Sequence, residues 1–284
     1  MTDPPPTAVA EPKPAASVMI VREAPAGAPE PVEVYMIRRK KTMKFLGGFY
    51  AFPGGKVDPD DASAAALGAC HGLDLDEAAR CFPDHATPAP LAFWVAAVRE
   101  LLEETGVLLA CDASGRALDS RAPRFSERLQ AARLALVGGR EGFPALLARE
   151  GWRCDLRPLR YVSYFVTPRS SPIRFAARFF LCRLPAGQEP RLFTEESSEA
   201  FWIHPGDGYR RFLAGELAMA EPAEFGLAYI AQFRSVAELW DACGDNREKF
   251  TGIIDRIEFW QGFDWKRGEG PQPGRRGPRS GGGV

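Results

Sequence analysis

Two stretches near the start of the chain have the pattern of β-strands, the first a short apolar run and the second an alternation of side chains between two faces. Residues 17–22 (SVMIVR) form the first and residues 32–39 (VEVYMIRR) the second, with a turn-rich connection between them. A shorter extended stretch, residues 49–52, ends in Pro53-Gly54-Gly55. Two glycines after a proline indicate a tight backbone feature, or a point where a ligand or a helix comes close.

The next strong pattern is helical and precedes Gly106. With 3.6 residues per turn, one side of this helix is a broad apolar stripe for a core, formed by Leu91, Trp94, Val95, Val98, Leu101 and Leu102. Glu100, Glu103 and Glu104 share a different, narrow face because of their i, i+3, i+4 spacing. Thr87 is a candidate N-cap with Pro88 in the first turn, and Gly106 is a candidate C-terminal cap.

The rest of the chain mixes the two kinds of pattern. Short helices are predicted within residues 60–82, and further helices at 124–150 (with a break near Gly138-Gly139), 206–243 and 250–265. Strands are predicted at 107–110, 159–167, 174–183 and 199–203. Without an internal repeat, this mixture indicates an α/β or α+β fold.

Composition limits the class of protein. The 284 residues, 45% of them hydrophobic, suit one large domain or one domain with appendages. Residues 1–15 and 267–284 are rich in Pro, Gly or Ala, and we expect a disordered tail at each end. A formal net charge of −1 gives no general attraction to nucleic acid.

The cellular compartment of the protein is predicted from motifs that the sequence does not contain. The six cysteines form no CxxC pair and no zinc spacing, so they are expected to be free thiols in a reducing compartment. We find no secretory signal and no apolar run of the ~20 residues that a membrane span needs. A cytoplasmic protein without membrane or nucleic-acid partners is therefore predicted, and a homodimer is allowed.

The three glutamates on one helix face have two interpretations. Like charges at this spacing repel by roughly 0.2–0.5 kcal/mol per pair. The face is either a solvated acidic stripe or a site for a hard divalent cation, which would remove the repulsion and take oxygen ligands.

The segments PGGKVDPDD and RELLEETGV together resemble the signature of the Nudix hydrolases. Arg99 to Val107 agree with the second half of that signature at every defined position, and Gly55 agrees with its first glycine. Asp61 stands where the family has Glu, and 37 residues instead of seven separate it from Arg99. The resemblance covers about residues 17–205 and implies an α/β/α sandwich with a mixed central sheet.

That resemblance also defines the expected organisation. The Nudix domain would span residues 16–205, with a helical insertion at about 62–90, and a C-terminal helical extension would follow at 206–266. An insertion at this point resembles the branch that contains acyl-CoA diphosphatases. The segment MIRRKKTMKFLGGFYAFPGG is similar to the signature of coenzyme A-cleaving members, in which Arg39 and Gly48 fit and Lys44 replaces a second arginine.

The family resemblance assigns roles to residues. Glu103 and Glu104 would be the primary ligands of Mg²⁺ or Mn²⁺, with Glu100 and the Gly55 carbonyl as further ligands, and Arg99 would orient a glutamate. The expected substrate-binding residues are Arg39, Lys44, Gly48, Gly54 and Gly55. Glu199 is the first choice for a fourth metal contact or general base, and Glu195 and Glu196 lie in the same acidic segment.

Three functions remain open from the sequence. The leading one is metal-dependent cleavage of the small molecules coenzyme A or acyl-CoA to 3′,5′-ADP and a 4′-phosphopantetheine product. The second is cleavage of ADP-ribose or another nucleoside diphosphate derivative. The third is a non-catalytic ligand-binding module, against which the presence of all three glutamates argues.

Overall fold

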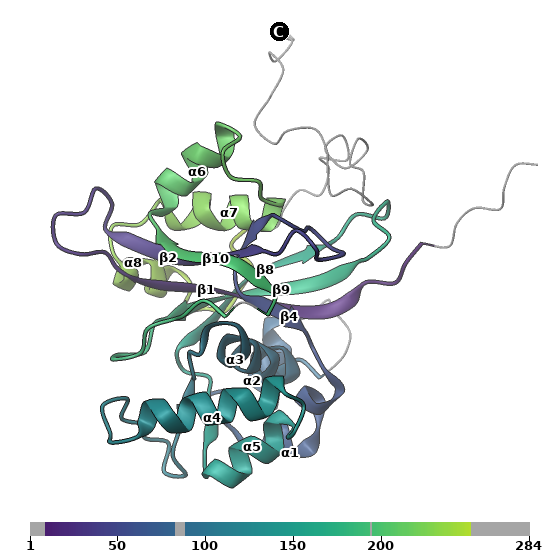
Figure 1. The fold of residues 1–284 in the computed structure, drawn as a ribbon, viewed down its shortest axis with the longest axis vertical. Coiled ribbons are helices and arrows are strands. Elements are labelled where there is room, and N and C mark those ends of the chain that lie inside the picture. The colour runs from purple at the N-terminus through teal and green to yellow at the C-terminus, as the bar shows by residue number, and fades with distance from the viewer. Residues whose placement is uncertain (1–8, 83–88, 194, 251–284) are drawn as a thin grey trace, which may run out of the picture.

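A mixed β-sheet runs through the middle of the molecule (Figure 1). The computed structural model describes residues 9–82, 89–193 and 195–250. The strand order of the central sheet is β10 (Ser197–Ile203), β2 (Val32–Arg39), β1 (Lys13–Glu23), β9 (Phe175–Arg183) and β8 (Leu159–Val166). Two short strands complete it: β3 (Tyr50–Ala51) pairs with β2, and β4 (Gly54–Lys56) pairs with β1. Strands β1 and β9 are parallel, and the other pairs are antiparallel.

Helices cover both faces of this sheet, so the fold is the expected α/β/α sandwich. On one face lie η1 (Pro59–Ala62), α1 (Ala64–Gly68), α2 (Leu75–Cys81), α3 (Leu91–Thr105), α4 (Phe125–Val137) and α5 (Phe143–Glu150). On the other lie α6 (Pro205–Leu213), α7 (Glu221–Ile230) and α8 (Val236–Ala242). The alternation along β1 explains both cores, because Val18 and Ile20 enter the α3 side while Met19 and Val21 enter the α7 side.

Helix α3 is the most buried helix on its side of the sheet. Alanines at positions 92, 96 and 97 are completely buried, and the helix packs directly against β1 and β4. It ends where the sequence predicts: Gly106 has φ of 72°, a left-handed conformation that suits glycine, and its N–H donates to Leu102 O at 3.1 Å. The predicted N-cap Thr87 lies outside the described residues, and the helix begins at Leu91.

Some predicted boundaries differ from the structure. Strand β1 begins at Lys13, so the last three residues of the expected N-terminal tail belong to the sheet. The glycines after Pro53 belong to strand β4, and Gly55 lies close to helix α3, which is one of the two alternatives that the sequence left open. A small second sheet consists of β5 (Cys70–His71), β7 (Arg153–Asp155) and β6 (Ala110–Cys111). Of these residues, only Ala110 falls in a predicted strand, the one at 107–110. The expected insertion contains α1, β5 and α2, whereas residues 251–266 of the expected C-terminal extension and the tail 267–284 lie outside the described ranges.

Two expectations about the whole chain can be compared with the structure. All six cysteines are free, five of them buried and Cys81 partly exposed, as predicted. Among the helices of the described residues, none is both long enough and apolar enough to cross a membrane.

Candidate active site

Strand β4 lies close to both β1 and α3 because its two glycines lack a side chain. Gly54 has φ of 150°, and a Cβ there would lie 2.2 Å from Ala16 O. A Cβ on Gly55 would lie 2.4 Å from the Glu100 carboxylate. The sequence Gly54-Gly55 therefore permits a close approach between the β1–β4 pair and the glutamate face of the helix.

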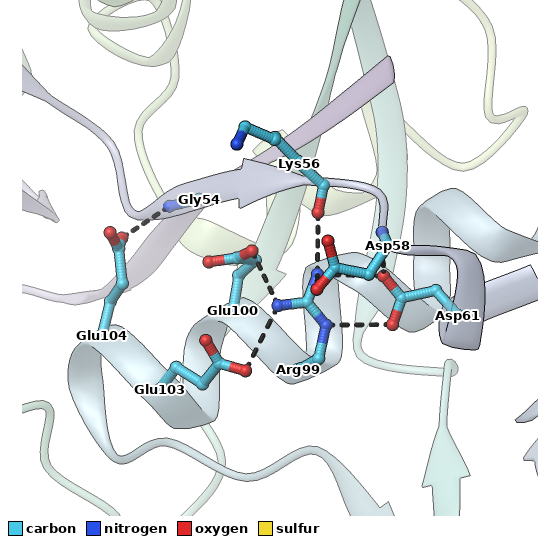
Figure 2. A network of polar contacts seen from close by, with 8 residues as sticks. All are labelled: Gly54, Lys56, Asp58, Asp61, Arg99, Glu100, Glu103 and Glu104. Atoms are coloured by element: carbon cyan, nitrogen blue, oxygen red, sulfur yellow. Dashed lines mark hydrogen bonds and ion pairs between the residues drawn. The ribbon is translucent and has the colours of Figure 1, made fainter. Parts of the chain in front are cut away.

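Arg99 is the centre of the polar network in Figure 2. Its Nε and Nη2 donate to the two carboxylate oxygens of Asp61, each at 2.9 Å, and Nη2 also donates to Lys56 O at 2.7 Å. Its Nη1 donates to Glu100 at 2.8 Å and to Glu103 at 3.2 Å. Arg99 thus joins α3 to the segment after β4 and contacts two of the three glutamates, and its orienting role stays a prediction.

Asp61 makes more contacts in this network than the sequence suggested. It lies in η1 and is completely buried, and its carboxylate also accepts a hydrogen bond from the backbone N–H of Asp58, at 2.8 Å, as part of a capping box. Burial raises the pKa of Asp61, and the hydrogen bonds from Arg99 oppose that rise. Asp61 therefore anchors Arg99, although it is shorter than the glutamate of the family signature.

The surroundings of the three glutamates disfavour their ionised forms. Burial raises the pKa of Glu100 to about 7; Arg99 opposes this effect and Glu103 adds to it. Burial together with repulsion from Glu100 raises the pKa of Glu104 to about 8, although Glu104 accepts the Gly54 N–H at 2.7 Å. Burial raises the pKa of Glu103 as well. These carboxylates outnumber the one arginine among them, so a cation at this point would favour their ionised forms.

The donor set suits a hard divalent cation. Carboxylate oxygens are the ligands that Mg²⁺ and Mn²⁺ prefer, and the glutamates lie along one side of α3 facing β4 (Figure 2). In the part of the chain that the structure describes, no three His, Cys, Asp or Glu side chains already converge as a complete ligand set. Binding would therefore require the glutamates to turn from Arg99 and Gly54 toward the ion.

A cavity of about 970 Å³ opens beside these glutamates. The predicted substrate-binding residues Arg39, Lys44, Gly54 and Gly55 line it, together with Arg99 and the three glutamates. Gly48 is not among the lining residues. Its φ of 84° and its N–H bond to Arg39 O at 3.0 Å show that it shapes the loop that carries Lys44.

The acidic segment before and within β10 divides into two groups. Glu195 and Glu196 line the cavity. Glu199 is not among the lining residues; its carboxylate accepts the Tyr50 hydroxyl at 3.2 Å and lies 3.6 Å from Arg38. The sequence-based role of Glu199 stays a prediction, and its two neighbours have the better placement for contact with a ligand.

Arg133 is a cavity residue that the sequence reasoning missed. It projects from α4 and is only 3% exposed. Its Nε donates to Glu103 O at 2.7 Å, its Nη2 lies 3.3 Å from the Glu195 carboxylate, and its guanidinium lies 3.3 Å from the centre of the Phe193 ring. It therefore links the end of α3 to the acidic segment. No local motif marks it, because its contacts depend on how α4 packs.

Comparisons with known proteins identify the family of this chain. The family model described as the NUDT19 Nudix domain matches residues 12–230. The chain is 30% identical over 220 residues to a Caenorhabditis elegans protein named as nudix hydrolase 7, covering 78% of this chain and 60% of the relative. It is 29% identical over 252 residues to the human acyl-coenzyme A diphosphatase NUDT19, covering 77% and 66% respectively. The chain thus spans less than two thirds of the length of these relatives.

A solved structure shows the same fold. A NUDIX hydrolase from Alicyclobacillus acidocaldarius superimposes with a TM-score of 0.63 at 33% identity, over 81% of this chain and 96% of that one. The family-model match continues past residue 205 to include α6 and α7. With the signature residues gathered around Arg99 and most of the chain matched, the protein belongs to the Nudix hydrolase family, in its NUDT19 Nudix-domain group.

Proposed function

We propose that this protein is a divalent-metal-dependent hydrolase that cleaves the diphosphate of coenzyme A or acyl-CoA. The observation that carries the proposal is the cluster of the buried Glu100 and the partly buried Glu103 and Glu104, which line the same cavity as Arg39 and Lys44. Nudix hydrolases generally use divalent metals, and the coenzyme A part rests on the name of the human relative. The products would be 3′,5′-ADP and (acyl-)4′-phosphopantetheine.

The glutamates would hold Mg²⁺ or Mn²⁺, with Glu103 and Glu104 as the main ligands and Glu100 and the Gly55 carbonyl as further ones. The ion would neutralise diphosphate charge and lower the pKa of a bound water. Arg99 keeps the glutamates aligned, since it contacts two of them directly.

The cations and the acidic segment have separate roles. Arg39 and Lys44 line the cavity and would bind phosphate oxygens, Arg39 through its planar guanidinium and Lys44 as a point charge. Glu195 or Glu196 would accept the proton of the attacking water, since both line the cavity; Glu199 remains the alternative from the sequence. Phosphoryl transfer depends mainly on such positioning and charge.

The test is direct product analysis. The full chain is incubated with coenzyme A, acyl-CoA or ADP-ribose and with Mg²⁺ or Mn²⁺, and 3′,5′-ADP is measured by chromatography. Glu103→Gln should abolish product, whereas Glu127→Gln, the same change at an exposed glutamate of α4, should not. Cleavage of ADP-ribose alone would refute the substrate assignment, and full activity of Glu103→Gln would refute the metal site.

A further inference from the structure

The cavity extends well beyond the glutamates and changes in chemical character along its length. The glutamates come from α3, on one face of the sheet. A second group of lining side chains comes from the α7 face of the sheet, from the start of α7, and from the β2–β3 and β8–β9 loops. These side chains are hydrocarbon: Phe45, Leu46, Phe49, Phe52, Phe165, Ile173, Phe175, Ala177, Phe179, Pro222 and Ala223. A diphosphate needs none of these contacts.

The sheet register explains how an open trough forms there. Ala177 of β9 lies between Ala15 of β1 and Phe165 of β8, and all three line the cavity. Register partners on neighbouring strands project to the same face. The two alanines leave the floor of the trough low, while aromatic side chains rise beside it.

The walls are held by contacts between aromatic rings. Phe45, from the loop that also carries Lys44, meets Phe175 of β9 edge to face, with ring centres 5.0 Å apart. Phe165 and Phe179 meet in the same way at 5.6 Å and are only 5% and 7% exposed. The start of α7 also lines the cavity, through Glu221, Pro222 and Ala223. The wall is therefore built from separate elements packed together.

We propose that this trough, the apolar arm of the cavity, binds the acyl chain of an acyl-CoA thioester, and that Ala177 with the surrounding phenylalanines sets the chain-length preference. The inference rests on the proposed function. A hydrocarbon chain needs no polar partners, whereas recognition of an adenine edge needs several hydrogen-bonding groups. The side chains named above offer carbon surface, and the polar groups that line the cavity beside them are the Lys13 ammonium, the hydroxyls of Ser17, Thr42, Tyr50 and Thr167, and the Glu221 carboxylate.

The first measurement is kcat/KM for free coenzyme A and for acetyl-, butyryl-, octanoyl- and palmitoyl-CoA. Full burial of one methylene corresponds to about a fourfold gain. We expect octanoyl-CoA to exceed acetyl-CoA by at least tenfold, with a plateau or a fall once the chain outgrows the trough. Equal kcat/KM for all thioesters and for free coenzyme A would overturn the inference while leaving the proposed function intact. Absence of cleavage of every coenzyme A compound would overturn both.

A matched pair of variants locates the effect. Ala177→Leu fills the floor of the trough and should lower the octanoyl-CoA to acetyl-CoA ratio by about tenfold. Ala176→Leu, the neighbouring position on β9, lies outside the cavity lining and should keep the wild-type ratio. If Ala177→Leu does not fold, Ala177→Val makes a smaller step in the same direction. An unchanged ratio in the folded Ala177 variant would overturn the assignment.

A binding measurement separates the trough from the metal site. S-octanoyl-pantetheine carries the acyl arm without a diphosphate, so its binding should not depend on the glutamates. We expect it to bind both the wild type and Glu103→Gln, and to bind Ala177→Leu at least fivefold more weakly, by isothermal titration calorimetry. Loss of binding in Glu103→Gln, or equal binding to the Ala177 variant, would contradict the proposal. If 3′,5′-ADP displaces S-octanoyl-pantetheine from the trough and binds there more tightly, the trough would be an adenine site instead.

Discussion

Replacement of Asp61 tests whether the two parts of the Nudix signature are held together by the buried ion pair with Arg99. Asp61→Ala removes both carboxylate bonds to Arg99, at 2.9 Å each, and the bond that the same carboxylate accepts from Asp58 N–H. The Arg99 side chain is only 6% exposed, so solvent cannot replace the lost partner.

The magnitude follows from this burial. Removing one partner of a buried pair costs roughly 3–5 kcal/mol, because a charge remains uncompensated. Arg99 keeps Glu100, Glu103 and the Lys56 carbonyl, so we expect the lower end, about 3 kcal/mol. For a domain of this size that corresponds to a fall in Tm of roughly 6–12 °C. Asp61→Asn keeps one acceptor oxygen and should lose about 1–3 kcal/mol.

The assay is urea unfolding, followed by activity measurements on the folded variants. Asp58→Asn is the matched control, since the Asp58 side chain is 56% exposed and 3.8 Å from Arg99, and it should change stability by less than about 0.5 kcal/mol. Asp61→Glu restores the family residue but adds a methylene to a fully buried site, which should destabilise by about 1–3 kcal/mol. If Asp61→Ala is no less stable than Asp58→Asn, the ion pair does not join the two segments.

Three further predictions concern the same site. The pKa values of Glu100 and Glu104 rise to about 7 and 8 on folding, so the native chain binds more protons than the unfolded chain between pH 5 and 8. The free energy of unfolding of the metal-free protein should therefore fall as the pH rises from 5 to 8, and Mg²⁺ should raise Tm most at pH 8. A Tm that does not change with pH in calorimetry would refute this. Gly55→Ala places a Cβ 2.4 Å from the Glu100 carboxylate and should lower activity at least tenfold, whereas Gly68→Ala, with open space around it, should not. Arg133→Ala should lower kcat more than it raises KM, while Arg128→Ala, an exposed arginine of the same helix, should leave both unchanged.

Long, regular patterns made most of the fold predictable. Residues 32–39 form β2 with the predicted limits, and the helix before Gly106 ends where its left-handed cap predicts. The small sheet could not be predicted in the same way. Its strands have two or three residues each, and Cys70 of the insertion pairs with Cys154, far along the chain. Such short strands exist only because of distant partners, so local periodicity carries no signal for them.

The candidate site also has a part that local sequence patterns predict and a part that they do not. Helical spacing alone places Glu100, Glu103 and Glu104 on one face, and the structure has them side by side. Arg133 could not be found in this way, because its bonds to Glu103 and Glu195 depend on the packing of α4 against the end of α3.

The insertion leaves the site intact because the site depends on contacts and not on spacing along the chain. In the family signature, few residues separate the acidic residue from Arg99, whereas here 37 residues do. The structure restores the arrangement by capping: Asp61 is fixed in η1 by its bond to Asp58 N–H, and η1 packs directly against α3. With η1 in this position, the short carboxylate of Asp61 reaches both Nε and Nη2 of Arg99. A longer or shorter insertion should therefore be tolerated, provided that the Asp58–Asp61 turn and the start of α3 at Leu91 are preserved.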